Sequence, residues 1–293
     1  MTTSTTVKRL SIYELAARKE RGERFAVLTA YDYATARLVD QAGIPAILVG
    51  DSLGVVVLGY PDTLSVTLDD MVRHTQAVMR GTKHAIVIAD MPFMSYQVSI
   101  EDAVRNAGRL IKETGAQAVK LEGGQHIAPT IRRLVEIGIP VMAHIGLTPQ
   151  SINQLGGNRV QGRSTSAAQK LLDDAFAIQD AGAFSVVIEG VPAPLAERIS
   201  TELTIPTIGI GAGAGCDGQV QVLYDMLGLF EDFTPRHTKH YAELAATIRA
   251  ATDDYCREVR ERAFPSAKES FSMDQSLVDE LHYGPSSSAA ERA

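Results

Sequence analysis

The chain has 293 residues, a formal net charge of −7 at pH 7 and a sequence pI of about 5.5. Hydrophobic residues make up 45% and charged residues 22% of it, which is typical of a globular protein with a sizeable core. It has no basic run and no apolar run near the ~18 residues of a membrane span, so we expect neither nucleic acid nor membrane as a partner.

The N-terminus and the cysteines indicate a cytoplasmic protein. Residues 1–9 are polar and rich in threonine, and they lack the apolar core of an export signal. Cys216 and Cys256 have no spacing typical of a disulfide framework or a metal site, which fits a reducing compartment.

Apolar runs typical of buried strands alternate along the chain with amphipathic runs typical of helices. A first helix is expected at 11–21, ahead of the first strand, where it caps one end of the domain. Residues 219–227 fit either a last strand or a helix. The expected strands lie at 25–30, 44–50, 85–90, 118–124, 141–146, 185–191 and 207–213. The further expected helices lie at 33–42, 67–82, 99–114, 127–137, 166–181, 193–203 and 241–263.

Seven strand-then-helix units, and an eighth with an ambiguous strand, indicate a closed (β/α)8 barrel. The strands are apolar on both faces, as parallel strands buried on both sides must be. A doubly wound sheet is the alternative, but no G-x-G-x-x-G motif follows the first strand. We expect an arm and capping helix over 1–23, a catalytic barrel over 24–264 and a mostly disordered tail over 265–293.

Ionisable side chains stand at the ends of five consecutive expected strands. In a barrel of this kind the active site gathers at the C-terminal ends of the strands, whereas charges placed at random favour helix faces and the opposite loops. These strand ends are therefore our candidate site. Its residues are Asp51, Ser52, Asp90, Lys120, Glu122, His144 and Glu189.

Three of these residues predict a metal site. Asp51, Asp90 and Glu122 come from adjacent strands, and an all-oxygen set without cysteine suits Mg²⁺ before Zn²⁺. A 2-oxo acid can chelate such an ion through its carboxylate and ketone oxygens, and the ion then stabilises an enolate. Lys120 and Glu122 are two residues apart on one strand, so they point the same way.

Structural roles compete with each functional one. A single aspartate after a strand is more often a turn former or helix cap, and only the combination of three carboxylates reverses those odds. Lys120 is as readily a structural ion pair and His144 as readily a core histidine, whereas Glu189 is costly to bury without a partner. The glycine-rich turn 209–215 suits either phosphate binding or tight packing of a strand against a helix.

Seven motifs carry a resemblance to a known family over residues 7–264. They are LVGDSLG, ADMPFMSY, VKLEGG, AHIGLTPQS, GGNRVQGR, IEGVP and PTIGIGAG. In this order and spacing they closely resemble the ketopantoate hydroxymethyltransferase family, which consists of (β/α)8 barrels of the phosphoenolpyruvate/pyruvate superfamily. The resemblance implies transfer of a hydroxymethyl group from 5,10-methylenetetrahydrofolate to 3-methyl-2-oxobutanoate with Mg²⁺, in a cytoplasmic homodecamer of the pantothenate and coenzyme A pathway.

The resemblance also implies roles for individual residues. Asp51 and Asp90 match metal ligands and Glu122 completes the metal site. Ser52 and Lys120 match positions that bind the 2-oxo acid in the same pocket.

The resemblance further assigns Glu189 to the position of the family's proton acceptor. His144 lies in the substrate pocket without a settled role, and no motif identifies the folate site.

Three other functions remain as alternatives. The first is an isocitrate-lyase-like lyase or phosphonopyruvate-type mutase, although such enzymes typically carry a cysteine or another acid in the loop at 147–165, which has neither here. The second is an aldolase that forms a Schiff base with Lys120. The third is a barrel that serves as a scaffold or binding protein, which the cost of several uncompensated carboxylates disfavours.

Overall fold

The computed structural model describes residues 9–281, in which eight parallel strands close into a barrel in sequence order. Each strand pairs with the next along the chain, and β8 pairs with both β7 and β1. The predicted (β/α)8 barrel is therefore confirmed. The strands are β1 Phe25–Thr29, β2 Ala46–Val49, β3 Ile86–Asp90, β4 Ala118–Glu122, β5 Val141–Gly146, β6 Ser185–Glu189, β7 Thr207–Ile210 and β8 Gly218–Gln221.

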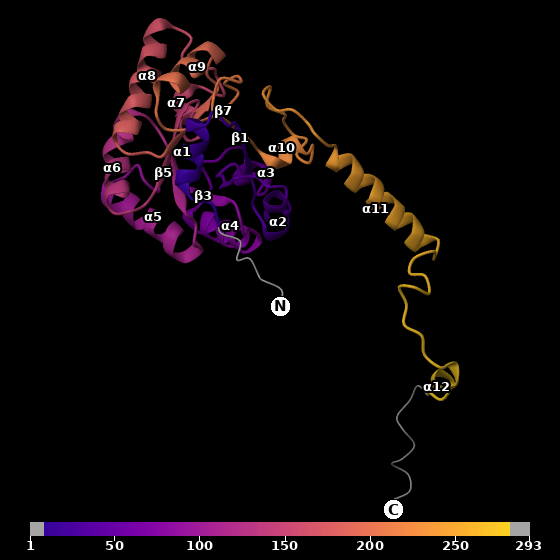
Figure 1. Ribbon diagram of the computed structural model, residues 1–293. Helices are drawn as coiled ribbons and strands as arrows, with labels where there is room; N and C mark the ends of the chain where they lie inside the picture. The colour runs from indigo at the N-terminus through magenta and orange to yellow at the C-terminus, as the bar shows by residue number, and fades with distance from the viewer. Residues whose placement is uncertain (1–8, 282–293) are drawn as a thin grey trace, which may run out of the picture. The chain divides into compact units, whose positions relative to one another are not determined.

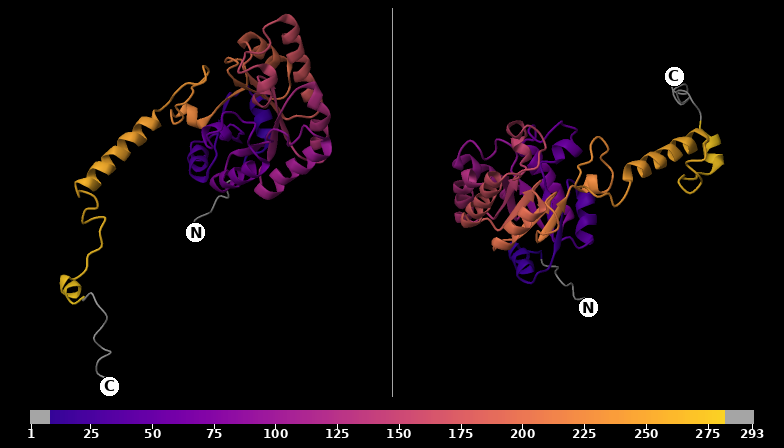
Figure 2. Two further views of the ribbon diagram at one scale, coloured as in Figure 1. Left: turned by 180° about the vertical axis from the view of Figure 1, so that it is seen from behind. Right: turned by 90° about the horizontal axis from the view of Figure 1, so that it is seen from above.

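Helices surround the strands (Figures 1 and 2). Consecutive long helices after α1 pack side by side, from α2 round to α9. The long helices of this part are α1 Ile12–Glu20, α2 Tyr33–Gln41, α4 Leu68–Gly81, α5 Ile100–Thr114, α6 Ala128–Glu136, α8 Thr165–Asp180 and α9 Ala193–Glu202. Short helical turns that the sequence did not predict are α3 Leu53–Val56, α7 Ile152–Leu155, η1 Gln125–Ile127 and η2 Pro149–Ser151, whereas the short helix α10 Leu223–Met226 lies in the segment that fitted either a strand or a helix.

The ambiguous segment at 219–227 contains both a strand and a helix. Residues Gly218–Gln221 form β8 and Leu223–Met226 form α10. In β8 only Val220 belongs to the apolar interior of the barrel, and the glutamines beside it are polar. The strand therefore lacks the continuous apolar run that marks the other seven.

Several strands end earlier than the apolar runs suggest, because glycines turn the chain. The runs at 185–191 and 207–213 end as strands at Glu189 and Ile210. The next residues, Gly190 and Gly211, have φ values of 57° and 60°, which other residues adopt only at a cost. These turns leave the last strand residues at the rim of the barrel.

The helix α1 closes the N-terminal end of the barrel, as predicted. Leu15 is fully buried and belongs to one apolar cluster with the interior residues of the strands. Lys19 ties the same helix to the strand ends, since its Nζ lies 2.9 Å from Asp217 Oδ2. The interior residues of this cluster are Phe25, Val27, Ala46, Leu48, Ile86, Ile88, Ala118, Met142, Val187, Ile208 and Val220.

The chain divides into two compact units, residues 1–242 and 243–293. The second contains α11 Leu244–Arg260, within the helix expected at 241–263, and the short helix α12 Gln275–Asp279. Residues 1–8 and 282–293, parts of the predicted arm and tail, lie outside the described residues. The predicted domain boundaries and the disorder of the tail stay predictions. No helix in the described part is long and apolar enough to cross a membrane.

The buried side chain of Leu15 predicts that α1 stabilises the barrel. We expect Leu15→Ala to lower the free energy of unfolding by about 2–5 kcal/mol, because it removes a fully buried leucine from the interior cluster. Urea denaturation measures this loss. Tyr13→Ala is the matched control on the same helix, since Tyr13 is 77% exposed, and we expect it to change stability by less than about 0.5 kcal/mol. Equal effects of the two substitutions would show that α1 is not anchored in the barrel.

Candidate active site

The polar residues of the site face the inside of the barrel, like the apolar cluster, but they lie nearer the C-terminal ends of the strands. On β3, β4, β5 and β6 the residues two positions beyond inward-facing apolar residues are charged or titratable. Asp90 and Lys120 are neighbours across β3 and β4, and Glu122 and His144 are neighbours across β4 and β5. The lower half of the barrel interior is thus apolar and the upper half carries the chemistry.

Asp90 links the end of β2 to β4. Lys120 Nζ lies 2.7 Å from Asp90 Oδ1 and forms a buried ion pair with it. The backbone N–H of Asp51 donates to Asp90 Oδ2 at 3.0 Å. Asp51 itself follows β2 by two residues, where the chain turns into α3. The two aspartates predicted as metal ligands are therefore adjacent in space.

His144 bridges two glutamates from neighbouring strands. Its Nδ1 lies 3.3 Å from Glu122 Oε1 and its Nε2 lies 3.2 Å from Glu189 Oε2. Neither contact has the alignment of a hydrogen bond, so the two contacts are ion pairs. Glu189 is the more accessible glutamate, with 14% of its side chain exposed against 3% for Glu122. This arrangement gives His144, whose role the sequence left open, a position between the metal candidates and the proton-acceptor candidate.

Two neutral side chains that sequence reasoning missed hold the carboxylates. Gln150 Nε2 donates to Asp51 Oδ2 at 2.8 Å, and the Gln150 backbone N–H donates to Glu122 Oε2 at 3.0 Å. The Tyr96 hydroxyl lies 2.7 Å from Gln150 Oε1. Tyr96 lies in the motif ADMPFMSY and Gln150 in the motif AHIGLTPQS. Their place in motifs that carry the family resemblance was the only sequence feature that could have pointed to them.

Tyr31 is a third residue that the sequence analysis missed. Its hydroxyl lies 2.8 Å from Ser52 Oγ, and its ring is fully enclosed and packs edge-on against Tyr224. This contact fixes the side chain of Ser52 at the wall of the cavity.

Burial and the charges of neighbouring groups shift the pKa values of the site. Burial, followed by the like charges of Asp90 and Glu122, raises the pKa of Asp51 to about 8. Burial lowers the pKa of Lys120, but Asp90, Glu122 and Asp51 outweigh burial and the net shift is upward. Burial likewise opposes the positive form of His144, yet Glu122 and Glu189 raise its pKa to about 9. Lys120 and His144 are therefore cationic at neutral pH.

The donor set fits a hard divalent cation. Asp51, Asp90 and Glu122 bring three buried carboxyl groups together, and burial followed by the like charges of Asp90 and Glu122 raises the pKa of Asp51. Within residues 9–281, no group of three or more His, Cys, Asp or Glu side chains is arranged so that all of them could bind one metal ion. That is compatible with Mg²⁺, which usually takes one or two carboxylates and keeps several waters.

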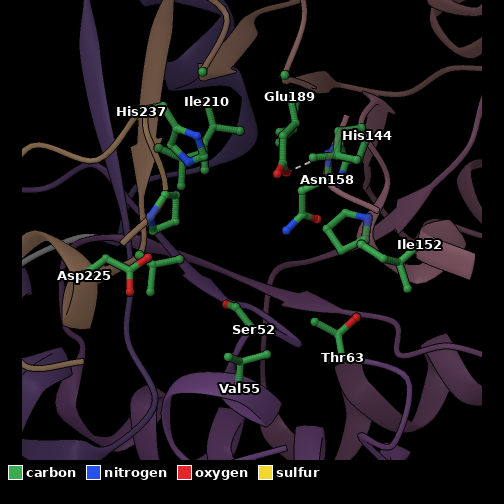
Figure 3. A pocket seen from close by; sticks show the side chains of 18 of the residues that line it. Ser52, Val55, Thr63, His144, Ile152, Asn158, Glu189, Ile210, Asp225 and His237 are labelled. Atoms are coloured by element: carbon green, nitrogen blue, oxygen red, sulfur yellow. Dashed lines mark ion pairs between the residues drawn. The ribbon is translucent and has the colours of Figure 1, made fainter. Parts of the chain in front are cut away.

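All seven residues predicted from the strand ends line one cavity of about 1190 Å³. In Figure 3 the Glu189 carboxylate points toward His144 on one wall, and Ser52 lies across the hollow from them. The cavity extends far beyond these residues, to Tyr60, Asn158 and His237 in the surrounding loops.

The glycine-rich turn after β7 packs closely against α9. A Cβ atom at Gly213 would lie 2.4 Å from the Cβ of Ala193, and one at Gly215 would lie 2.6 Å from the Cβ of Glu197. Of the two interpretations left open by the sequence, tight packing of a strand against a helix therefore accounts for these two glycines.

Comparison with known families and curated proteins gives a consistent result. A sequence model of the family described as ketopantoate hydroxymethyltransferase matches residues 9–267. The chain is 57% identical over 273 residues to the 3-methyl-2-oxobutanoate hydroxymethyltransferase of Dehalococcoides mccartyi strain CBDB1, which covers 93% of this chain and 98% of that protein. It is 60% identical to the enzyme of the same name from Chloroflexus aurantiacus strain J-10-fl, over 91% of this chain and 94% of that protein.

Solved structures share the fold at low sequence identity. A phosphonopyruvate hydrolase is 13% identical with a TM-score of 0.59, over 92% of this chain and 94% of that one. A 2,3-dimethylmalate lyase, described as a member of the PEP mutase/isocitrate lyase superfamily, is 19% identical with a TM-score of 0.56, over 92% and 93%. At this identity the likeness shows the barrel fold alone.

The raised pKa of Asp51 predicts a dependence of stability on pH in the metal-free protein. Between about 3.8 and about 8 the folded state keeps a proton that the unfolded state has lost, so this contribution to stability disappears as the pH rises through that window. Asp51→Asn removes the titrating group. We therefore expect the stability of the variant relative to wild type to increase from about pH 5 to about pH 9.

Urea denaturation in the presence of a chelator measures this difference. Asp69→Asn serves as the control for loss of a carboxylate that is not buried, because the Asp69 side chain is 64% exposed. A constant difference between Asp51→Asn and wild type over the whole range contradicts the assignment of the raised pKa to Asp51.

Proposed function

The chain belongs to the ketopantoate hydroxymethyltransferase family, and on this premise we propose how it performs the reaction of that family. We propose that it uses Mg²⁺ and 5,10-methylenetetrahydrofolate to convert 3-methyl-2-oxobutanoate into 2-dehydropantoate through an enolate. The observation that carries this proposal is the cluster of Asp51, Asp90 and Glu122 beside the Lys120 ammonium in one buried site. The family resemblance further supports a homodecamer in the cytoplasm that serves pantothenate and coenzyme A synthesis.

Asp51 and Asp90 are the residues that hold Mg²⁺ in this proposal, and Glu122 completes the site. Bound there, Mg²⁺ supplies Lewis acidity that polarises a ketone and stabilises the negative charge of an enolate. Gln150 and Lys120 keep the carboxylates in place through the hydrogen bonds at Asp51 Oδ2 and Asp90 Oδ1.

Lys120 and Ser52 bind the 2-oxo acid. The raised pKa of Lys120 keeps its ammonium charged beside Asp90, so it attracts the substrate's negative charge. The Ser52 hydroxyl, fixed by Tyr31, offers a hydrogen bond to the substrate carboxylate.

Glu189 accepts the proton from C3 of the substrate. It is the more exposed of the two glutamates beside His144, and the cationic His144 lies 3.2 Å from its Oε2. The C–H electron pair moves into the enolate. Water adds to the methylene carbon of the folate and both C–N bonds of that carbon break, which leaves tetrahydrofolate and formaldehyde. C3 of the enolate forms a carbon–carbon bond with the formaldehyde carbon, whose oxygen takes up a proton and becomes the hydroxyl group of the product.

The alternatives fit the site less well. A Schiff-base aldolase needs a neutral lysine, whereas the Lys120 ammonium is buried in an ion pair that stabilises its charge. A lyase or mutase of the same fold typically requires a cysteine or another acid in the loop after β5, and residues 147–165 contain neither.

We expect the wild-type protein to exchange the C3 hydrogen of 3-methyl-2-oxobutanoate with deuterated water only when Mg²⁺ is present. Asp51→Ala and Asp90→Ala should abolish this exchange, because each removes a proposed ligand of the ion. Proton NMR follows the exchange, and Asp69→Ala is the surface control. Undiminished exchange in both variants would refute the metal site. Formation of 2-dehydropantoate should additionally require 5,10-methylenetetrahydrofolate.

Glu189→Gln separates proton transfer from metal binding. We expect it to slow C3 exchange by about 10²–10⁴-fold, because the amide cannot accept the proton. Its affinity for Mg²⁺, measured by calorimetry, should remain that of the wild type. Glu136→Gln is the control, since the Glu136 side chain is 58% exposed on the barrel surface. Exchange at the wild-type rate in Glu189→Gln removes Glu189 from the mechanism.

A further inference from the structure

Gln150 connects two of the buried carboxylates that line the cavity, those of Asp51 and Glu122. It lies in the turn Pro149–Ser151 after β5 and is only 5% exposed, although it carries a polar side chain. Its side chain and its backbone N–H contact carboxylates from two different strands, Asp51 after β2 and Glu122 on β4. No other described residue is hydrogen-bonded to both carboxylates.

The orientation of the Gln150 amide is determined by its neighbours. Its Nε2 lies 2.9 Å from the carbonyl oxygen of Met91 as well as 2.8 Å from Asp51 Oδ2. A carbonyl oxygen only accepts hydrogen bonds, so the NH₂ group must face this side. Its Oε1 then faces two donors, the Tyr96 hydroxyl at 2.7 Å and Gln97 Nε2 at 3.1 Å. Rotation of the amide by half a turn would place oxygen against oxygen on one side and donor against donor at Gln97.

The Tyr96 hydroxyl anchors this arrangement to the end of β4. It accepts from the backbone N–H of Glu122 at 3.0 Å, and its single proton is then free for a carbonyl-type oxygen. Gln150 Oε1 at 2.7 Å is nearer than the carbonyl oxygen of Glu122 at 3.2 Å. Tyr96 therefore donates to Gln150 and directs the opposite end of that amide toward Asp51.

A neutral donor suits this position. Asp51, Asp90 and Glu122 already bring more negative charge than Lys120 neutralises, so a carboxylate here would add repulsion. A cationic side chain would instead compete with a bound divalent cation. An amide supplies two N–H groups without either effect, and it restrains the Asp51 carboxylate through one oxygen.

We propose that Gln150 is a positioning residue that sets the affinity of this chain for Mg²⁺, and that Tyr96 acts on the same site through the Gln150 amide. This inference rests on the metal site of the proposed function. Hydrogen-bonding partners of metal-ligating residues typically change metal affinity by about 10–100-fold when they are removed. Because Gln150 already restrains the Asp51 carboxylate before the ion binds, that carboxylate loses less conformational freedom on binding than an unrestrained one would.

Calorimetric titration of the metal-free full-length protein with MgCl₂, in the absence of substrate, tests the proposal. We expect Gln150→Ala to weaken Mg²⁺ binding by about 10–100-fold. The Mg²⁺ concentration at half-maximal C3 exchange should rise by the same factor, whereas the exchange rate at saturating Mg²⁺ should return close to that of wild type. A purely structural role would lower the melting temperature and leave the Mg²⁺ affinity of the folded fraction unchanged.

Gln169→Ala is the matched control, because Gln169 is an exposed glutamine on α8 that bonds only to Asp173 among the described side-chain contacts. Tyr96→Phe is the second variant, which removes one hydroxyl and tests the proposal even if Gln150→Ala does not fold. We expect it to weaken Mg²⁺ binding by a smaller factor. In the double variant we expect no loss beyond that of Gln150→Ala, since Tyr96 acts through Gln150.

The outcomes distinguish this inference from the proposed function. If the wild-type protein binds no Mg²⁺, the metal site fails and the inference fails with it. If wild type binds Mg²⁺ and Gln150→Ala binds it equally well, the metal site stands and the role of Gln150 is refuted. Losses that multiply in the double variant would show that Tyr96 acts independently of the Gln150 amide.

Discussion

The whole site depends on the cost of burying like charges together. Asp51, Asp90 and Glu122 are each 5% exposed or less, and isolated carboxylates at such positions are strongly unfavourable. Each contacts a polar or charged partner: Gln150 for Asp51, Lys120 for Asp90, and His144, which Glu189 shares, for Glu122. Even with these partners, burial and the like charges of Asp90 and Glu122 raise the pKa of Asp51 to about 8, so Asp51 keeps a proton at neutral pH.

The barrel meets this constraint by dividing its interior into two layers. The apolar layer, closed by Leu15 of α1, fills the N-terminal half. Lys120, Glu122 and His144 follow this packed layer on the same strands. Stability and chemistry thus come from different positions of the same strands, two residues apart.

The sequence predicted the strands well and placed the charged residues of the candidate site at the strand ends, for one reason. A parallel strand buried on both faces is a continuous apolar run, so a charged residue such as Asp90 or Glu189 at its end is conspicuous. Val220 illustrates the limit, because the polar glutamines beside it hide the last strand. Gln150 and Tyr96 were missed because both lie outside the strands, where hydrogen-bond partners follow no periodicity.

The bridging position of His144 also has a consequence for sequence variation. The imidazolium of His144 contacts Glu122 through Nδ1 and Glu189 through Nε2, so the two glutamates share this cation. A substitution at either glutamate alters the electrostatic surroundings of His144, and the effect of a substitution at His144 will depend on which glutamates remain. Natural variants of this barrel should therefore keep the three residues together or exchange them as a set, in a strongly epistatic unit that spans β4, β5 and β6.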